Sequence, residues 1–251
     1  MNDYQLLINL HRCATRQGPG GESETKLALE LAGLDRSRPL KIADIGCGTG
    51  ASTILLAKEL DAKITAVDFL PDFLDELQSR AHDHRVADKI TTLNCSMDAL
   101  PFAAGEFDVI WSEGAVYNMG FEAGVSAWRR FLKPGGKLIV SEITWLSATR
   151  PLELQSHWER EYPEIDVASA KIGILERHGY SPEAYFILPT RCWLENYYRP
   201  MQSCFDEFLE RHGQNDQAKA IVEAEKHEIA LYAKYSAYYS YGVYVAKKCE
   251  A

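Results

Sequence analysis

The sequence contains no apolar run that approaches the roughly 20 residues of a membrane-spanning helix. Its first residues include Asp3, His11, Arg12 and Arg16 but no long apolar segment, so a secretory signal is not expected either. An internal repeat and a low-complexity tail are also absent from the sequence. These absences favour a cytoplasmic protein without a membrane span.

Basic charge and paired cysteines are scarce as well. Lys and Arg number 27 against 36 Asp and Glu, a net charge of -9, which argues against a general nucleic-acid-binding protein. None of the six cysteines forms a C-x-x-C pair, so we expect reduced thiols and neither a disulfide framework nor a zinc site. They are Cys13, Cys47, Cys95, Cys192, Cys204 and Cys249. The pair His82 and His84 fits the polar end of a helix better than a metal site, so no metal site is predicted.

What is present is the composition of an ordinary globular protein, 46% hydrophobic and 25% charged, with a sizeable core. The 251 residues are predicted to form one domain. We divide it into an N-terminal helical segment at residues 1–39, a ligand-binding core at 40–145, and a C-terminal half at 146–251 with cap helices and the final strands.

The stretch from Lys41 to Ala51, KIADIGCGTGA, organises the chain. A short apolar run leads into glycines at alternate positions, Gly46, Gly48 and Gly50, and a helix-like pattern follows. Glycines are needed where the backbone takes positive φ or where a ligand must approach closely. Because the turn opens at a helix N-terminus, free N–H groups there favour a negative or electron-rich ligand group.

Strands and helices then alternate along the chain, which predicts an α/β fold with a parallel sheet. The strands are expected at 63–67, 90–93, 107–111 and 137–143, and helices at 124–132, 152–161 and 203–234. Ligands bind outside the carboxyl ends of such strands. The candidate segments are therefore residues 46–50, 68–70, 95–98, 112–118 and 142–146.

Two ligand classes fit the glycine turn. Gly46, Gly48 and Ala51 satisfy the dinucleotide pattern G-x-G-x-x-G/A, and Asp68 lies at about the expected distance for a ribose-binding acid, which would make the chain an NAD(P)-dependent oxidoreductase. Asp44 argues against this, because a carboxylate at a buried strand end suits a ligand with a positive amino group better than a pyrophosphate.

The motif DIGCGTG at residues 44–50, the acid Asp68, the LPF segment at 100–102 and the KPGGKL turn at 133–138 together resemble a class I S-adenosylmethionine-dependent methyltransferase. The resemblance is closest to the small-molecule branch that includes the ubiquinone/menaquinone-type enzymes, and it covers roughly residues 40–145. It implies a Rossmann-like, mostly parallel seven-stranded sheet with helices on both faces and an antiparallel last strand, for which 239–247 is the candidate, with 184–188 before it.

The resemblance also assigns the cofactor-binding residues. Asp44 would serve the methionine ammonium group, Asp68 would accept from both ribose hydroxyls, and Phe69 would lie against adenine. Family members commonly carry Asp at the position of Ser96, so the adenine contact here would fall to Ser96 and Met97. The full set is Asp44, Gly46, Cys47, Gly48, Gly50, Asp68, Phe69, Ser96, Met97 and Glu113.

Methyl transfer to a small organic acceptor by in-line displacement needs mainly proximity and orientation, and a base only when the acceptor loses a proton. Glu113, Tyr117 and His157 are the catalytic candidates. Tyr117, Asn118 and Trp145 are the candidates for binding the acceptor.

Three questions stay open in the sequence. The chain could be a cofactor-binding protein of the same fold without turnover. The turn at residues 17–21 could be a plain linker between two helices, or a loop that folds over the ligand. The oligomeric state is open as well, with a homodimer among the expectations.

Overall fold

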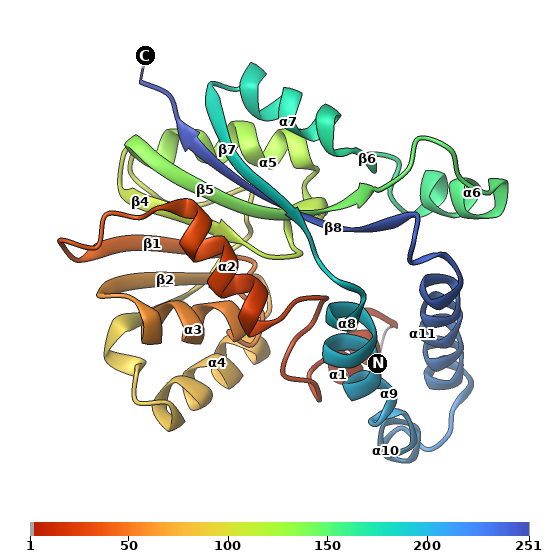
Figure 1. Cartoon of the computed structure of the whole chain (residues 1–251). Helices are drawn as coiled ribbons and strands as arrows, with labels where there is room; N and C mark the ends of the chain where they lie inside the picture. The colour runs from red at the N-terminus through yellow and green to blue at the C-terminus, as the bar shows by residue number, and fades with distance from the viewer. Residues whose placement is uncertain (1–2, 251) are drawn as a thin grey trace.

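The computed structural model describes residues 3–250, and they form a single sheet with helices on both faces (Figure 1). Seven strands are hydrogen-bonded in the order β3-β2-β1-β4-β5-β8-β7, and the short β6 pairs with β5 off this path. The strands are β1 Leu40–Ile45, β2 Ala62–Asp68, β3 Ile90–Asn94, β4 Phe107–Ser112, β5 Leu132–Trp145, β6 Asp166–Val167, β7 Tyr180–Ile187 and β8 Tyr239–Lys248.

Strands β1 to β5 are parallel, and β8 runs antiparallel between β5 and β7. The predicted mostly parallel sheet with an antiparallel last strand is therefore confirmed. The central strand β1 carries Ile42 into the core on one face and Ala43 and Ile45 into the core on the other. Because both faces are covered, four of its six residues are apolar and they do not alternate with polar ones.

The helices divide between those two cores. On one face lie α2 Glu22–Ala32, α3 Ala51–Glu59 and α4 Pro71–Asp83, and on the other lie α5 Phe121–Trp128 and α7 Ala168–Arg177. Three short turns of 3₁₀ helix complete this part of the fold: η1 Ala87–Lys89, η2 Val116–Asn118 and η3 Arg129–Phe131.

The remaining helices form a cap at one side of the sheet (Figure 1). It consists of α1 Asp3–His11, α6 Leu152–Glu161, α8 Thr190–Trp193, the π-helical turn η4 Leu194–Tyr198, α9 Arg199–Gln202, α10 Phe205–Arg211 and α11 Asp216–Tyr235. Its centre is aromatic: the Trp193 ring stacks on Tyr232 at 4.4 Å and on Tyr241 at 5.3 Å between centroids. The cap is thereby packed onto β8.

Three predictions are wrong in part. The single helix expected at 203–234 is two helices, α10 and α11, because Gly213 (φ 62°) and Gln214 (φ 54°) turn the chain between them. The helix expected at 124–132 ends at Trp128, and β5 already begins at Leu132, ahead of the Pro134 turn. Cys13 and Cys204 form a disulfide, whereas all six cysteines were expected to be reduced.

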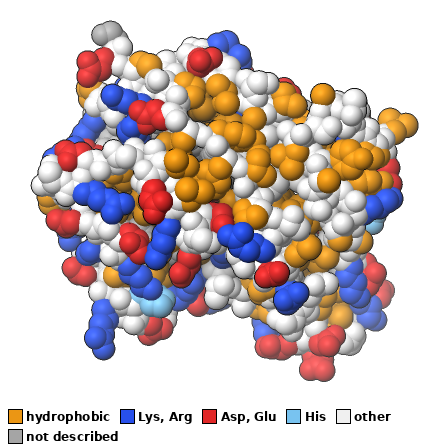
Figure 2. All heavy atoms as spheres, in the orientation of Figure 1, with side chains coloured by type: hydrophobic (Ala, Val, Ile, Leu, Met, Phe, Trp, Pro, Cys, Tyr) orange, Lys and Arg blue, Asp and Glu red, His pale blue; other side chains and the backbone are white. Residues whose placement is uncertain are grey.

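No helix among residues 3–250 is both long and apolar enough to cross a membrane. On the face shown in Figure 2, apolar side chains gather across the middle, and acidic and basic side chains are interspersed around them. Neither the acidic nor the basic side chains form a continuous patch on that face. This face therefore shows no charged surface that would bind a large partner of opposite charge.

Candidate functional site

The carboxyl ends of β1, β2, β3 and β4 meet at one edge of the sheet, as parallel strands require. The predicted site residues lie at this edge, in or just after the strand ends. They are the glycine turn and the predicted residues within 68–69, 96–97 and 113–118. Segments far apart in sequence thus lie together where ligands bind in open α/β sheets.

The glycine turn has the backbone that its composition predicts. Gly46, Gly48 and Gly50 have φ angles of 74°, 54° and 84°, which other residues rarely adopt. A β-carbon at Gly46 would lie 2.2 Å from that of Ala115, and one at Gly50 would lie 2.0 Å from Leu77 Cδ1. The turn therefore needs glycine both for its dihedral angles and for the close approach of neighbouring segments.

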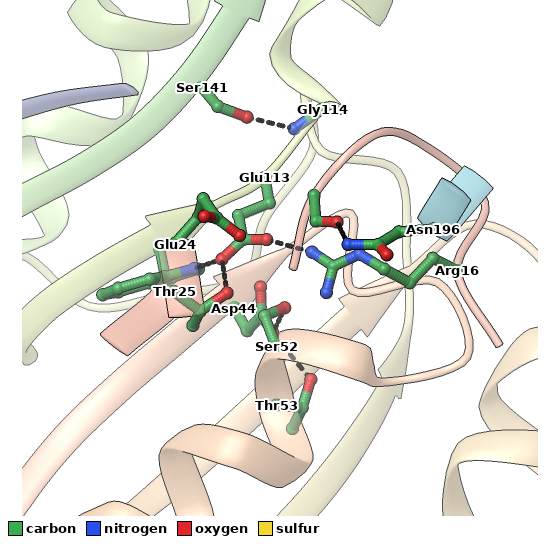
Figure 3. A network of polar contacts seen from close by, with 12 residues as sticks. Arg16, Glu24, Thr25, Asp44, Ser52, Thr53, Glu113, Gly114, Ser141 and Asn196 are labelled. Atoms are coloured by element: carbon green, nitrogen blue, oxygen red, sulfur yellow. Dashed lines mark hydrogen bonds and ion pairs between the residues drawn. The ribbon is translucent and has the colours of Figure 1, made fainter. Parts of the chain in front are cut away.

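Asp44, at the end of β1, is completely buried. Its Oδ2 accepts hydrogen bonds from Ser52 Oγ (2.9 Å) and Thr53 Oγ1 (2.6 Å), both in the first turn of α3 (Figure 3). Its Oδ1 has no hydrogen-bond partner. Burial raises the pKa of Asp44 to about 7 despite these two donors. The group is an internal anchor with one oxygen still able to accept.

Asp68 ends β2 and faces the glycine turn. Its Oδ2 accepts from the Gly48 backbone N–H at 2.9 Å and its Oδ1 from that of Leu70, also at 2.9 Å. Burial raises the pKa of this carboxyl group, and the backbone donors partly offset the effect. Each oxygen keeps a second lone pair, so the carboxylate can hold the turn and still accept from a ligand.

The expected adenine side is built from three side chains at the same edge. Phe69 is 64% exposed, which is unusual for so large an apolar ring. Ser96 and Met97 are half-buried, and the Met97 methyl group would lie 3.5 Å from a β-carbon at Gly46. Trp128 Nε1 donates to the Met97 carbonyl at 3.1 Å and fixes that segment.

Glu113 follows β4 and is held by three donors. Arg16 forms an ion pair with its Oε2, while Thr25 Oγ1 (2.8 Å) and Trp111 Nε1 (3.0 Å) donate to its Oε1 (Figure 3). A carboxylate with this many donors is fixed in position. It is less suited to act as a mobile base than the sequence suggested, and better suited to organise charge at the edge of the site.

Arg16 and Gln17 were not among the predicted site residues. They lie in the segment between α1 and α2, residues 12–21, which we call the strap. Gln17 Oε1 accepts from the Thr49 backbone N–H (3.0 Å) and from Thr49 Oγ1 (3.1 Å). The only signal was the glycine-rich turn at 17–21, interpreted either as a plain linker or as a loop that folds over the ligand. In the structure this segment contacts the glycine turn through Gln17.

The residues predicted to bind the acceptor or to act on it separate into two groups. The first lies on η2 after β4, and the second lies near Tyr239. Tyr117 is 45% exposed and meets Tyr162 edge to face at 6.2 Å, while Asn118 Nδ2 donates to the Ala115 carbonyl. Trp145 is buried against Tyr239, with Arg150 over its ring at 4.2 Å.

His157 belongs to the second group, because it packs against Trp158, whose ring also meets Tyr239. Burial lowers the pKa of His157, so its neutral form is favoured at neutral pH. Within the described range 3–250, no group of His, Cys, Asp and Glu is arranged to hold a metal ion.

Comparison with known proteins gives a consistent result. Residues 42–136 match the model of a family described as a methyltransferase domain. The chain is 26% identical over 219 residues to a 27-O-demethylrifamycin SV methyltransferase of Amycolatopsis mediterranei, covering 84% of this chain and 76% of that one. It is 29% identical to a demethylmenaquinone methyltransferase of Lactiplantibacillus plantarum, covering 60% of this chain and 62% of that one. The chain spans about half the length of several other curated relatives.

Among solved structures, the fold resembles that of an S-adenosylmethionine-dependent methyltransferase from Geobacter sulfurreducens in complex with S-adenosyl-L-homocysteine. The TM-score is 0.83 at 18% identity, with 96% of this chain and 97% of that one covered. The similarity therefore extends over the cap as well as the sheet.

Proposed function

The chain is a class I S-adenosylmethionine-dependent methyltransferase, and we propose that it transfers the methyl group to a small organic acceptor bound between the sheet edge and the cap. The observation that carries the proposal is the glycine turn with an aspartate on each side of it. Asp44 and Asp68 flank three glycines of positive φ. Asp44 has one carboxylate oxygen without a hydrogen-bond partner, and Asp68 accepts a hydrogen bond from the turn itself.

The nucleoside end of the cofactor would lie at the ends of β2 and β3. Asp68 would accept from the ribose hydroxyls, because its oxygens have spare lone pairs beside the Gly48 and Leu70 bonds. Phe69 would cover the adenine, which accounts for an apolar ring that is otherwise exposed. Ser96 and Met97 would contact the other side of the base.

The methionine end would lie at the glycine turn and the strap. The amino acid part of the cofactor is a zwitterion, and Arg16 and Glu113 present the two complementary charges next to Gly114, where β4 ends. We propose that their ion pair rearranges, so that Arg16 binds the carboxylate and Glu113 the ammonium group. Asp44 would then contribute through its free Oδ1, directly or through a water molecule.

When bound, S-adenosylmethionine supplies an activated methyl group on a sulfonium centre. The protein then has to hold the acceptor in line and exclude water, since positioning alone can supply a large share of the rate. Tyr117 and Asn118 stand on the turn that follows Glu113, and they are the proposed walls of the acceptor site. Trp145, at the end of β5, and His157, on α6 of the cap, would shape its far side.

Binding and turnover can be tested together. Calorimetry should show S-adenosyl-L-homocysteine binding and no binding of NADH, which would separate the methyltransferase from the NAD(P)-dependent alternative. A labelled-methyl transfer screen over quinols, phenols, amines and thiols would then identify the acceptor class. Cofactor binding without any methyl transfer would point to a binding protein of the same fold.

A cytoplasmic location is part of the proposal. It is supported by Cys47, Cys95, Cys192 and Cys249, which are free thiols and therefore compatible with a reducing compartment. The disulfide between Cys13 and Cys204 would be open to reduction there, and we propose that its state varies with the redox conditions.

A further inference from the structure

A hollow of about 290 Å³ lies at the edge of the sheet opposite the glycine turn, where β1, β4 and β5 begin and β8 ends (Figure 1). We call it the basal hollow. The loop between α2 and β1 and the turn at residues 133–137 contribute to its walls, whereas the residues proposed to hold the cofactor lie at the other edge of the sheet. Its charged lining residues are Asp35, Arg38, Asp108, Lys133, Lys137 and Lys247.

Asp108 is the buried acid of the basal hollow, and both of its carboxylate oxygens already accept hydrogen bonds. Its Oδ1 accepts from Arg38 Nη2 at 2.6 Å, and its Oδ2 accepts from Lys133 Nζ and from the Lys41 backbone N–H, both at 2.8 Å. Burial opposes ionisation, but these donors outweigh it and lower the pKa of Asp108 to about 2. One ionised carboxylate is thus shared between two cations, which leaves positive charge in surplus.

A second pair of cations lies on neighbouring strands. Lys137 on β5 and Lys247 on β8 are directly opposite each other in the antiparallel register. Like charges in this arrangement destabilise a sheet. Lys137 forms an ion pair with Glu183 on β7, whereas Lys247 is exposed and forms no ion pair with any residue of the range 3–250. The surplus charge of this pair is therefore carried by Lys247.

The two pairs of cations meet at the turn that begins with Lys133. A β-carbon at Gly135 would lie 3.5 Å from Lys247 Cε, so the stem of Lys247 lies against this turn. Gly135 has a φ of 69°, which favours glycine and fixes the direction of the turn. Lys133 and Lys247 therefore line the same hollow although they come from the two ends of different strands.

Positive charge exceeds negative charge around the basal hollow. Four of its lining side chains are cationic and two are acidic. The second acid, Asp35, accepts from the Ser37 N–H at 3.0 Å and from Ser37 Oγ at 2.6 Å within its own loop. One cation remains in surplus even when Glu183 is counted. The whole chain has a net charge of -9, so this local surplus is opposite in sign to the rest of the molecule.

An anion with several oxygens meets this description best. A cation would be repelled by the surplus charge, and a neutral molecule would leave it uncompensated. A phosphate monoester carries about -1.5 to -2 charges at pH 7 and has three acceptor oxygens, so it can bind cations that approach it from different sides. A carboxylate offers one charge and two oxygens, which would match fewer of these donors.

The size of the basal hollow limits the ligand to a small molecule. Ligand sites are commonly about 300–1,000 Å³, so a volume of 290 Å³ lies at the lower end of that range. A phosphorylated molecule of a few carbons, such as a sugar phosphate, is of this class. A nucleic acid offers phosphodiesters with one charge each, and the acidic chain as a whole would repel it.

We propose that the basal hollow binds a small phosphate monoester, with Arg38 and Lys133 on one side of the phosphate group and Lys247 on the other. Lys133 and Arg38 each keep N–H groups beside those that they donate to Asp108. Lys247 contributes an ammonium group without an ion-pair partner in the range 3–250. This binding involves no chemical step, and it is independent of the proposed methyl transfer.

Calorimetry in phosphate-free buffer at pH 7.5 can test the ligand class with two matched pairs, glycerol 3-phosphate with glycerate and ribose 5-phosphate with ribonate. At least one phosphate monoester should bind ten-fold or more tighter than its matched carboxylate. S-adenosyl-L-homocysteine should not displace it, because the proposed cofactor site lies at the other edge of the sheet.

Lys133→Gln and Lys247→Gln should each lower the affinity for that monoester ten-fold or more. Lys247→Gln should do so without lowering the midpoint of denaturant unfolding, which shows that the variant is folded. Lys226→Gln is the matched control, since it removes the same charge from α11, where the Lys226 side chain is 52% exposed.

Four results would overturn the proposal. They are the absence of binding by either monoester, equal affinity for a monoester and its carboxylate, an affinity that survives either lysine variant, and displacement by S-adenosyl-L-homocysteine. An equal loss of affinity in Lys226→Gln would also overturn it, because general attraction to a charged protein would then account for the binding.

Discussion

Three carboxylates of one site show how surroundings determine what an acid can do. Asp44 is fully buried with two hydroxyl donors, Asp68 is bonded to backbone N–H groups, and Glu113 is paired with a guanidinium. The sequence places all three at or just beyond the ends of strands, but it does not show their partners. Only the partners separate an internal anchor from a ligand acceptor and from a charge that is already neutralised.

Asp68→Ala should weaken cofactor binding by about 2–3 kcal/mol, the usual range when donors lose a charged acceptor in a buried site. Calorimetry with S-adenosyl-L-homocysteine measures this directly. Asp98→Ala is the control, because Asp98 is an exposed acid on a nearby turn. Unchanged affinity of Asp68→Ala would mean that Asp68 only clamps the glycine turn through Gly48 and Leu70.

Asp44→Asn should change how stability depends on pH. Burial raises the folded-state pKa of Asp44 from 3.8 to about 7, so the folded protein binds this proton more tightly than the unfolded chain. The resulting stabilisation is complete below pH 3.8 and is lost as the pH rises to about 7. Between pH 5 and pH 8 the wild type should therefore lose about 2–3 kcal/mol more stability than the variant, at 1.36 kcal/mol per pH unit.

Denaturant unfolding of both proteins at the two pH values measures the difference. Glu142, whose pKa burial also raises to about 7, is present in both proteins and cancels in the comparison. Parallel pH profiles would show that Asp44 stays ionised in the folded protein, and the assignment of a raised pKa would then be wrong.

At the scale of elements, the sequence was sufficient where the signal is local. The strand, glycine turn and helix at 40–59 follow from an apolar run and alternating glycines, and α6 at Leu152–Glu161 has the predicted bounds. The break between α10 and α11 has local signals too, Gly213 after α10 and Asn215 as the N-cap of α11, but they were overlooked in a long stretch rich in Glu, Lys and Ala.

Contacts between distant segments could not be predicted in this way. Arg16 meets Glu113 across 97 positions, and Gln17 meets Thr49 across 32. Nothing in the spacing of Arg or Gln marks a residue for a partner so far along the chain. The disulfide was missed for the same reason, since Cys13 and Cys204 are 191 positions apart and come together only once the cap is folded.

Gly46→Ala tests whether close approach or dihedral angle matters more in the glycine turn. Gly105 has nearly the same φ, 67° against 74°, but open space where a β-carbon would be. Gly105→Ala should cost only the left-handed backbone penalty of about 1–2 kcal/mol and bind the cofactor normally. Gly46→Ala should cost about 1–3 kcal/mol more, because its methyl group would overlap with Ala115, and should weaken binding.

Chemical denaturation and calorimetry of the two variants give both quantities. If they lose the same stability and bind alike, the segment carrying Ala115 moves aside without cost. The tight contact between the two turns would then have no role in forming the site.

At the scale of the whole molecule, the strap and the cap enclose the sheet edge from two directions. Asn196 Nδ2, in the cap, donates to the Gly20 carbonyl of the strap at 2.8 Å, and Arg191 pairs with Glu24 just beyond it. Arg80, on α4, donates to the carbonyls of Thr15 and Thr49. The strap is therefore bonded both to the cap and to the cofactor-binding core, and whatever fixes it also fixes Arg16.

The disulfide is the covalent part of this enclosure, and its removal should loosen the site. Cys13 lies three positions before Arg16, and Cys204 lies between α9 and α10 of the cap. Cys13→Ser should cost about 2–4 kcal/mol of stability, the usual range for a native disulfide. It should also weaken S-adenosyl-L-homocysteine binding, because Arg16 and Gln17 are then ordered only when the cofactor binds.

Wild-type protein treated with a reductant should behave as Cys13→Ser does, and Cys13→Ser itself should not respond to the reductant. Cys249→Ser is the control, since Cys249 is a free thiol at the end of the chain. Affinity measured with and without reductant decides the matter. If reduction lowers the unfolding temperature but leaves cofactor affinity unchanged, the strap holds Arg16 in place through its hydrogen bonds alone. The disulfide would then stabilise the fold without influencing the site.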